Sequence, residues 1–136
     1  MSVAVLDKVG HAGLDTERAS RLFAAALSTL GLDLERIGEV SVALVDPETI
    51  RSLNLEFRDR NEPTDVLSFE VDGPYGEMVG EVMICPECAD RGMGVDELVV
   101  HGALHLGGME HGEDFGASEM ARLQRAVMEE WRGEES

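Results

Sequence analysis

The chain has 136 residues, 43% of them hydrophobic, and these values predict one globular domain over residues 1–136. No apolar run could span a bilayer, no signal peptide is visible, and two cysteines are too few for a disulfide framework. We therefore expect a cytoplasmic protein without membrane contact. Lys and Arg number 11 and Asp and Glu number 28, giving a net charge of −17 that disfavours binding of nucleic acid through a broad basic surface.

The first half of the chain predicts two strands and two helices. An apolar run at 3–6 and an alternating run at 40–44 indicate the strands. Asp15 is placed to cap the first helix, which Gly31 ends, and Asp46-Pro47-Glu48 is typical of a second helix start. The predicted inner faces are Ala19, Leu22, Phe23, Ala26, Leu27 and Leu30 in the first helix, and Ile50, Leu53 and Phe57 in the second.

The second half predicts a hairpin and two further helices. A polar loop at 58–64 precedes strands at 66–71 and 78–85, joined by a turn at 72–76. One helix is expected from about 96 to 106, and a last helix from about 118 to 132 carries Met120, Leu123, Val127 and Trp131 inward. The order of elements predicts a single small α+β domain with a mixed sheet of about four strands.

Three of the four histidines lie within the eleven residues HGALHLGGMEH. His101 and His105 are four residues apart and therefore share one face of the predicted helix. The Gly107-Gly108 pair allows a sharp turn that could return His111 to the same point. Three imidazoles and an open fourth position favour one catalytic zinc ion per chain.

The same spacing resembles the HExxHxxGxxH motif of metzincin peptidases at His101, His105, Gly108 and His111. Gly102 stands where such a peptidase has the glutamate that acts as general base. A peptidase is therefore the weaker interpretation, although a zinc hydrolase of another substrate, including peptide, remains an alternative.

Two motifs resemble those of the YbeY family of ribosomal-RNA maturation endoribonucleases. HGALHLGGMEH matches the family pattern HGxLHLxGyDH, and a second family pattern is matched by Leu53-Asn54, Phe57-Arg58 and the run from Pro63 to Phe69. A weaker match is Gly80-Glu81-Val82-Met83-Ile84, where the family usually has GDI. The departures, such as Glu110 for aspartate and Phe57 for tyrosine, remove no proposed zinc ligand.

The resemblance implies a zinc-dependent, single-strand-selective endoribonuclease with a metzincin-like three-histidine site on a helix and the following turn. It implies zinc ligands at His101, His105 and His111, and a phosphate-binding Arg58 that acts in catalysis with His105. The implied role is 16S 3′-end maturation and quality control of the 30S subunit, with rRNA and a ribosomal protein as partners of a monomer. Whether activated water or the RNA 2′-OH attacks stays open.

A ribosome assembly factor with a structural zinc is the main alternative, and the acidity of the chain favours it. Arg51 and Arg60 could extend a basic strip with Arg58, although Asp59 and Glu62 interrupt it. Cys85-Pro86-Glu87-Cys88 forms a C-x-x-C motif, which we interpret as packing residues at the start of a short helix rather than a redox or metal site.

Overall fold

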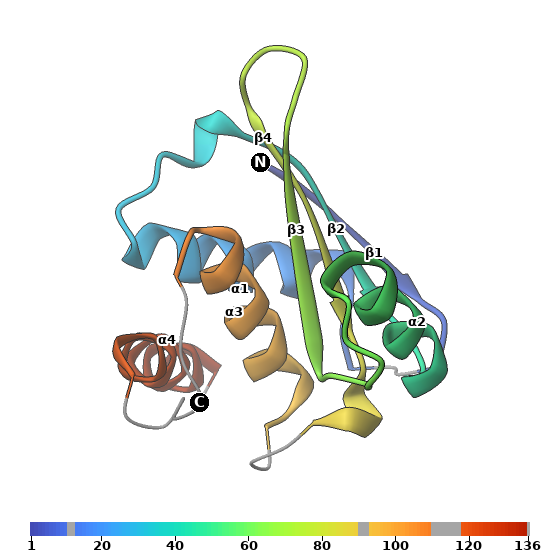
Figure 1. Cartoon of the computed structure of the whole chain (residues 1–136). Coiled ribbons are helices and arrows are strands. Elements are labelled where there is room, and N and C mark those ends of the chain that lie inside the picture. The colour runs from blue at the N-terminus through green and yellow to red at the C-terminus, as the bar shows by residue number, and fades with distance from the viewer. Residues whose placement is uncertain (11–12, 90–92, 110–117, 136) are drawn as a thin grey trace.

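The computed structural model describes the whole chain except residues 11–12, 90–92, 110–117 and 136. Within these residues, a four-stranded sheet lies between helices (Figure 1). The elements in chain order are β1 (Ser2–Asp7), α1 (Thr16–Thr29), β2 (Ile37–Leu44), α2 (Pro47–Arg58), β3 (Val66–Asp72), β4 (Met78–Ile84), α3 (Val95–Leu106) and α4 (Glu119–Glu135). Two short 3-10 helices, η1 (Leu34–Arg36) and η2 (Pro86–Cys88), complete the order.

The sheet is mixed, with strand order β1-β2-β4-β3. β1 and β4 each pair with β2 in parallel, whereas β3 and β4 form an antiparallel hairpin. β3 is therefore an edge strand with a single neighbour. The prediction of a small α+β domain with a mixed sheet of about four strands is confirmed.

The predicted helix starts are confirmed by their caps. The side chain of Asp15 accepts a hydrogen bond from the backbone N–H of Arg18 at 2.8 Å, and Asp46 accepts one from Thr49 at 2.7 Å. The latter bond lowers the pKa of Asp46, because it stabilises the ionised carboxylate. Both caps satisfy N–H groups that have no partner inside their own helix.

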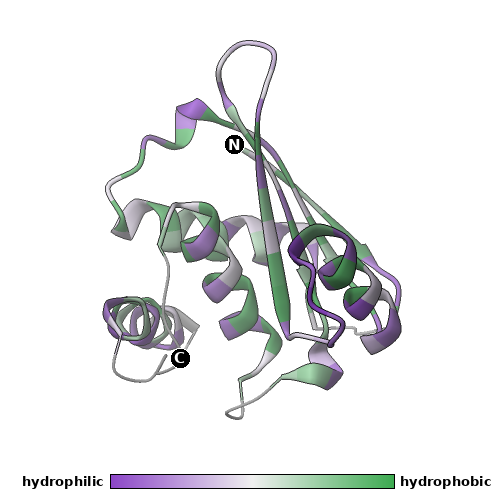
Figure 2. Ribbon diagram, viewed as in Figure 1, coloured by the Kyte–Doolittle hydropathy of each residue, from purple (hydrophilic) through white to green (hydrophobic). Residues whose placement is uncertain are grey.

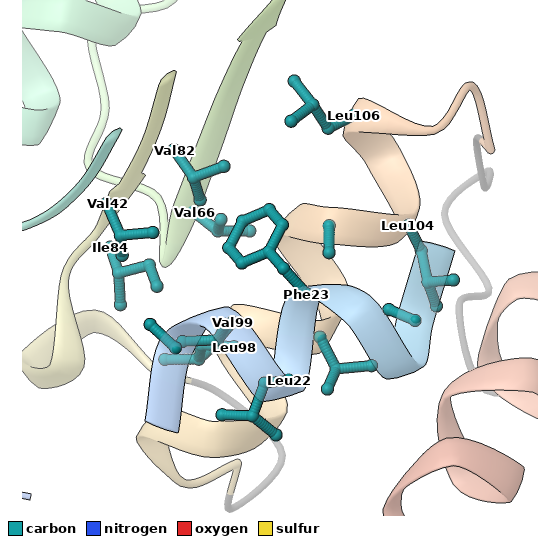
Figure 3. Close-up of a cluster of buried hydrophobic side chains, with 14 of the residues drawn as sticks. Leu22, Phe23, Val42, Val66, Val82, Ile84, Leu98, Val99, Leu104 and Leu106 are labelled. Carbon is teal, nitrogen blue, oxygen red and sulfur yellow. The ribbon is translucent and has the colours of Figure 1, made fainter. Parts of the chain in front are cut away.

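The alternation of side chains along the strands divides the core into two clusters, one on each face of the sheet. The larger cluster joins the sheet to α1, α3 and α4, and Figure 3 shows Val66 and Val82 of the hairpin beside Phe23 of α1. The smaller cluster lies under α2 and consists of Ala43, Val45, Ile50, Leu67 and Cys85, with Leu53, Phe69, Met83 and Cys88 packed against it. In Figure 2, green hydrophobic and purple hydrophilic residues alternate along α2 and α4, and the strands carry green stretches interrupted by purple ones.

The prediction that Phe57 belongs to the core is wrong. Ile50 is fully buried and Leu53 is partly buried, but Phe57 is 59% exposed. Phe57 lies in the last turn of α2 and is not part of the small cluster; its ring packs against Phe69 of β3, with 5.0 Å between ring centroids. Within the described residues, none of the helices combines the length and apolarity that crossing a membrane requires.

Candidate metal centre and phosphate-binding residue

The histidine helix packs unusually close to the sheet at Gly102. A Cβ atom at this position would lie 2.5 Å from Cγ1 of Val82 and 3.2 Å from Cγ2 of Val66. The Ser68 hydroxyl of β3 donates a hydrogen bond to the Gly102 carbonyl at 3.0 Å. Position 102 therefore faces the sheet and has no room for a glutamate, which gives a structural reason against the peptidase interpretation.

The two glycines after α3 end the helix as predicted. Gly108 adopts a φ of 101°, which favours glycine, and the Met109 N–H donates to the Leu104 carbonyl at 3.0 Å. This is the hydrogen bond of a Schellman motif. The turn brings the carbonyl of Met109 to 2.9 Å from Nδ1 of His105.

His101 and His105 point their Nε2 atoms at each other, 3.2 Å apart. His101 is buried, with 4% exposure, and its Nδ1 lies 2.9 Å from Oε1 of Gln124 in α4. The other amide atom of Gln124, Nε2, lies 3.6 Å from the sulfur of Met93, which can only accept a hydrogen bond. This contact orients the amide so that its oxygen faces His101.

These contacts decide the tautomers of both rings. A carbonyl or amide oxygen only accepts hydrogen bonds, so each Nδ1 must carry the proton and donate it. In the neutral rings both Nε2 atoms then present lone pairs to each other at 3.2 Å. Two lone pairs repel at this distance unless a cation lies between them.

The spacing of the pair fits a zinc ion. Two nitrogen ligands at about 2.0–2.1 Å from a tetrahedral ion are about 3.3–3.4 Å apart, close to the observed separation. Imidazole nitrogens oriented by a second hydrogen bond at Nδ1 are the usual donor arrangement at zinc. His101 and His105 could therefore hold this metal through Nε2.

The third predicted ligand, His111, lies outside the described residues. In the part of the chain that the structure does describe, no cluster of three or more His, Cys, Asp or Glu side chains suits a metal ion. The three-histidine site thus stays a prediction for His111. The residue that the sequence analysis missed is Gln124; its signal was a polar residue one turn after Met120 on the inner face of α4.

Arg58 is the last residue of α2 and is exposed to solvent. The chain turns immediately after it, because Asp59 adopts a left-handed conformation with φ 56°. The buried side chain of Asn54 donates to the Glu62 carbonyl at 2.9 Å and so fastens the loop to α2. The backbone at Arg58 is therefore fixed, and the residue is exposed to solvent.

Arg58 differs from the neighbouring arginines in its partners. Arg51 binds both carboxylate oxygens of Glu48, and this hydrogen bonding, followed by the charge of Arg51, lowers the pKa of Glu48. Arg60 lies 3.8 Å from Glu62. Arg58 has no ion pair or side-chain hydrogen bond with any residue that the structure describes. Of the basic strip that the sequence suggested, Arg51 and Arg60 have carboxylate partners, and Arg58 has none among the described residues.

The structure places Arg58 and the histidines on different sides of β3. Figure 1 shows α2 beside this strand on the side away from α3 and α4. Arg58 makes no hydrogen bond with His101 or His105. The histidine pair and Arg58 are therefore neighbours of one edge strand and are not in direct contact.

Cys85 and Cys88 do not form a disulfide, and their sulfur atoms lie 2.7 Å apart. Cys85 is buried in the small cluster under α2. Burial, followed by the hydrogen bond to Cys85, raises the pKa of Cys88 to about 12. Because the thiolate is the reactive and metal-binding form, this environment supports the interpretation of both cysteines as packing residues.

The fold and this site define a class: a small α+β protein with a histidine pair, suited to a metal, on a helix packed against a mixed sheet. The family described as Endoribonuclease YbeY matches residues 7–132 of the chain. The chain therefore belongs to the YbeY family.

Two relatives in sequence agree with this assignment, and one solved structure is also similar over most of the chain. The chain is 64% identical to Endoribonuclease YbeY from Rubrobacter xylanophilus over 132 residues, which cover 96% of each chain. It is 34% identical to Endoribonuclease YbeY from Nocardioides sp., over 97% of this chain and 99% of that protein. The solution structure of TM1509 from Thermotoga maritima aligns with 97% of this chain and 93% of its own, at 26% identity and a TM-score of 0.49.

Proposed function

We propose that the chain is a zinc-dependent endoribonuclease that cleaves single-stranded RNA. The observation that carries this proposal is the pair of facing Nε2 atoms of His101 and His105, in a chain of a family named for endoribonuclease activity. His101, His105 and His111 would hold one zinc ion, and Gln124 and the Met109 carbonyl would keep the first two imidazoles in the ligating tautomer.

Arg58 would bind the phosphate of the substrate. Its guanidinium is planar and can donate two parallel hydrogen bonds to phosphate oxygens, and no carboxylate of the described residues competes for it. A phosphodiester gains negative charge in the transition state of its cleavage, and a positioned cation stabilises that charge. When bound, zinc supplies Lewis-acid activation of water and of a phosphoryl oxygen.

The substrate we propose is ribosomal RNA, with 16S 3′-end maturation and quality control of the 30S subunit as the role. The acidity of the chain supports a substrate that is delivered by a partner, because a protein of charge −17 associates slowly with free RNA. The 30S particle, through one of its proteins, is the partner we propose, and we expect the chain to act as a cytoplasmic monomer.

The same charge favours a second candidate function, a ribosome assembly factor that binds the 30S particle and uses its zinc to hold the fold. The two functions differ in whether RNA is cut. A zinc hydrolase of peptide is disfavoured, because the position of the peptidase general base faces Val82 and Val66.

The proposal is tested by quantifying zinc in the purified full-length protein and incubating it with single-stranded RNA and with 30S particles. Three variants accompany the wild type: His105→Ala, Arg58→Glu and Lys8→Glu. We expect about one zinc per chain and cleavage that both His105→Ala and Arg58→Glu abolish. Arg58→Glu should retain its zinc.

Lys8→Glu is the matched control. Lys8 is exposed, follows the opposite edge strand β1, and undergoes the same change of charge as Arg58. Its variant should cut RNA as the wild type does. Full activity of Arg58→Glu would remove the proposed role of Arg58, and a zinc-loaded protein that binds 30S particles and cuts neither substrate would favour the assembly factor.

A further inference from the structure

Phe57 carries an aromatic ring that is largely exposed to solvent. It is 59% exposed at the end of α2, whereas Phe23 and Trp131 are buried in the large cluster. Burying a Phe side chain fully stabilises the folded protein, and a ring as exposed as Phe57 contributes only part of that stabilisation. Phe57 instead contacts Phe69 of β3, with the two rings inclined at 58°.

The aromatic pair lies across one strand from the histidine pair. Phe69 follows Ser68 in β3, and successive side chains of a strand point to opposite faces. Ser68 bonds the carbonyl of Gly102, next to His101, while Phe69 packs in the cluster under α2. Because β3 is an edge strand, no other strand covers its outer margin. An extended RNA chain could pass over this margin from the aromatic pair to the histidine pair.

Arg58 stands directly beside Phe57 in sequence and lacks a carboxylate partner among the described residues. The last turn of α2 thus carries an exposed aromatic ring and, at the next residue, an exposed arginine without a carboxylate partner among the described residues. Single-stranded nucleic acids are bound by this combination, in which rings stack on bases and cations contact the backbone.

We propose that the Phe57 ring, which packs against Phe69, is a stacking platform for one nucleobase of single-stranded RNA. Arg58 binds the phosphate next to that nucleobase. The inference rests on the proposed nuclease function and names how its substrate is held. It also suits the charge of the chain, since stacking on a neutral ring does not depend on attraction between the RNA and the protein surface. A platform of this kind selects unpaired bases, because bases inside a duplex have no free face.

The experiment measures binding of a fluorescein-labelled single-stranded RNA to the full-length protein by anisotropy, with the RNA checked to be intact afterwards. Phe57→Leu keeps an apolar side chain but removes the aromatic face, and we expect its Kd to rise about 5- to 150-fold, the value of one stacked base. Phe57→Trp should restore binding. Tyr75→Leu is the control, because Tyr75 is 93% exposed at the hairpin turn and is not part of the platform.

The salt dependence separates stacking from charge. Phe57→Leu should leave the slope of log Kd against log salt unchanged, whereas Arg58→Gln should lower that slope by about 0.7, the value for one phosphate contact on a single strand. Replacing one nucleotide at a time by an abasic site should reveal one position whose loss weakens the wild type and not Phe57→Leu.

Three results would overturn the inference. The first is equal RNA affinity of wild type and Phe57→Leu while the wild type still cuts RNA, which leaves the nuclease proposal standing. The second is weaker binding of 30S particles by Phe57→Leu with unchanged affinity for free RNA, which would mark the ring as a protein contact. The third is a wild type that neither binds nor cuts RNA, which removes both proposals.

Discussion

Replacing Gln124 by leucine should weaken zinc binding without unfolding the protein. Leucine matches glutamine closely in size but has no oxygen to accept the proton of His101 Nδ1, now bonded at 2.9 Å. His101 can then adopt the other tautomer and donate from Nε2 to the Nε2 of His105, 3.2 Å away. That hydrogen bond uses both ligating lone pairs, so zinc has to break it before binding.

The loss can be given a magnitude. Removing an outer hydrogen-bond partner of a ligating histidine weakens metal affinity about 10- to 100-fold, which corresponds to about 1.4–2.8 kcal/mol. This exceeds the net contribution of about 0.5–1.5 kcal/mol from an ordinary hydrogen bond, because the new hydrogen bond between the histidines must also be broken.

The assay is competition for zinc against a chromophoric chelator, with wild type and the Gln124→Leu and Gln124→Glu variants. Gln124→Glu keeps an acceptor oxygen and should bind zinc at least as tightly as the wild type. Nitrogen-15 spectra of the metal-free proteins report the tautomers directly: His101 should be protonated at Nδ1 in the wild type and at Nε2 in Gln124→Leu. If Gln124→Leu, still folded, binds zinc with wild-type affinity and shows the wild-type tautomer, the reasoning is refuted.

Two further predictions concern packing and thiol reactivity. Gly102→Ala should lower the free energy of unfolding in urea by about 1 kcal/mol, since overpacking costs about 2 kcal/mol at the middle of its usual range and helix propensity returns up to about 1 kcal/mol. Gly133→Ala, whose Cβ would meet nothing within 4 Å, should not destabilise, and a stable Gly102→Ala would contradict the close packing of α3 on Val82. The raised pKa of Cys88, about 12 against 9.0, should make its alkylation by iodoacetamide at pH 8 about 1000-fold slower in the folded than in the unfolded protein. The folded-state rate should climb about tenfold per pH unit as the thiolate forms, and rapid modification at pH 8 would refute the shift.

Local patterns predicted the elements well, because the signals that start and end helices are short-range. Asp15 and Asp46 cap as predicted, and the Gly107-Gly108 turn appears where the glycines stand. The order of the strands was not predicted, since parallel pairing of β2 with β4 joins segments separated by two other elements. Periodicity could not place Phe57 either: it shows which residues share a helix face, but not where the sheet beneath that face ends.

In the candidate site, too, short-range contacts were predictable from the sequence and long-range contacts were not. His101 and His105 come together through i, i+4 spacing alone, which a sequence displays. Gln124 reaches His101 only because α4 packs against α3, a contact that depends on tertiary structure. The residue that fixes the tautomer was therefore invisible to motif analysis, although a buried glutamine always requires a partner.

The ion-pair partners of the arginines suggest how so acidic a chain could act on RNA as we propose. Most of its described cations are already engaged, as Arg18 is with Asp96 and Arg132 with Glu97. Whatever such pairs contribute to stability, they remove cations from competition for phosphate. Among the described residues Arg58 has no carboxylate partner, and it follows an exposed ring in the chain, which is why we propose that a short-range contact at this place binds RNA that the net charge would otherwise repel. Such a surface favours the proposed recognition of RNA at one place over general affinity for RNA, and it suits our proposal that a partner brings the protein to its substrate.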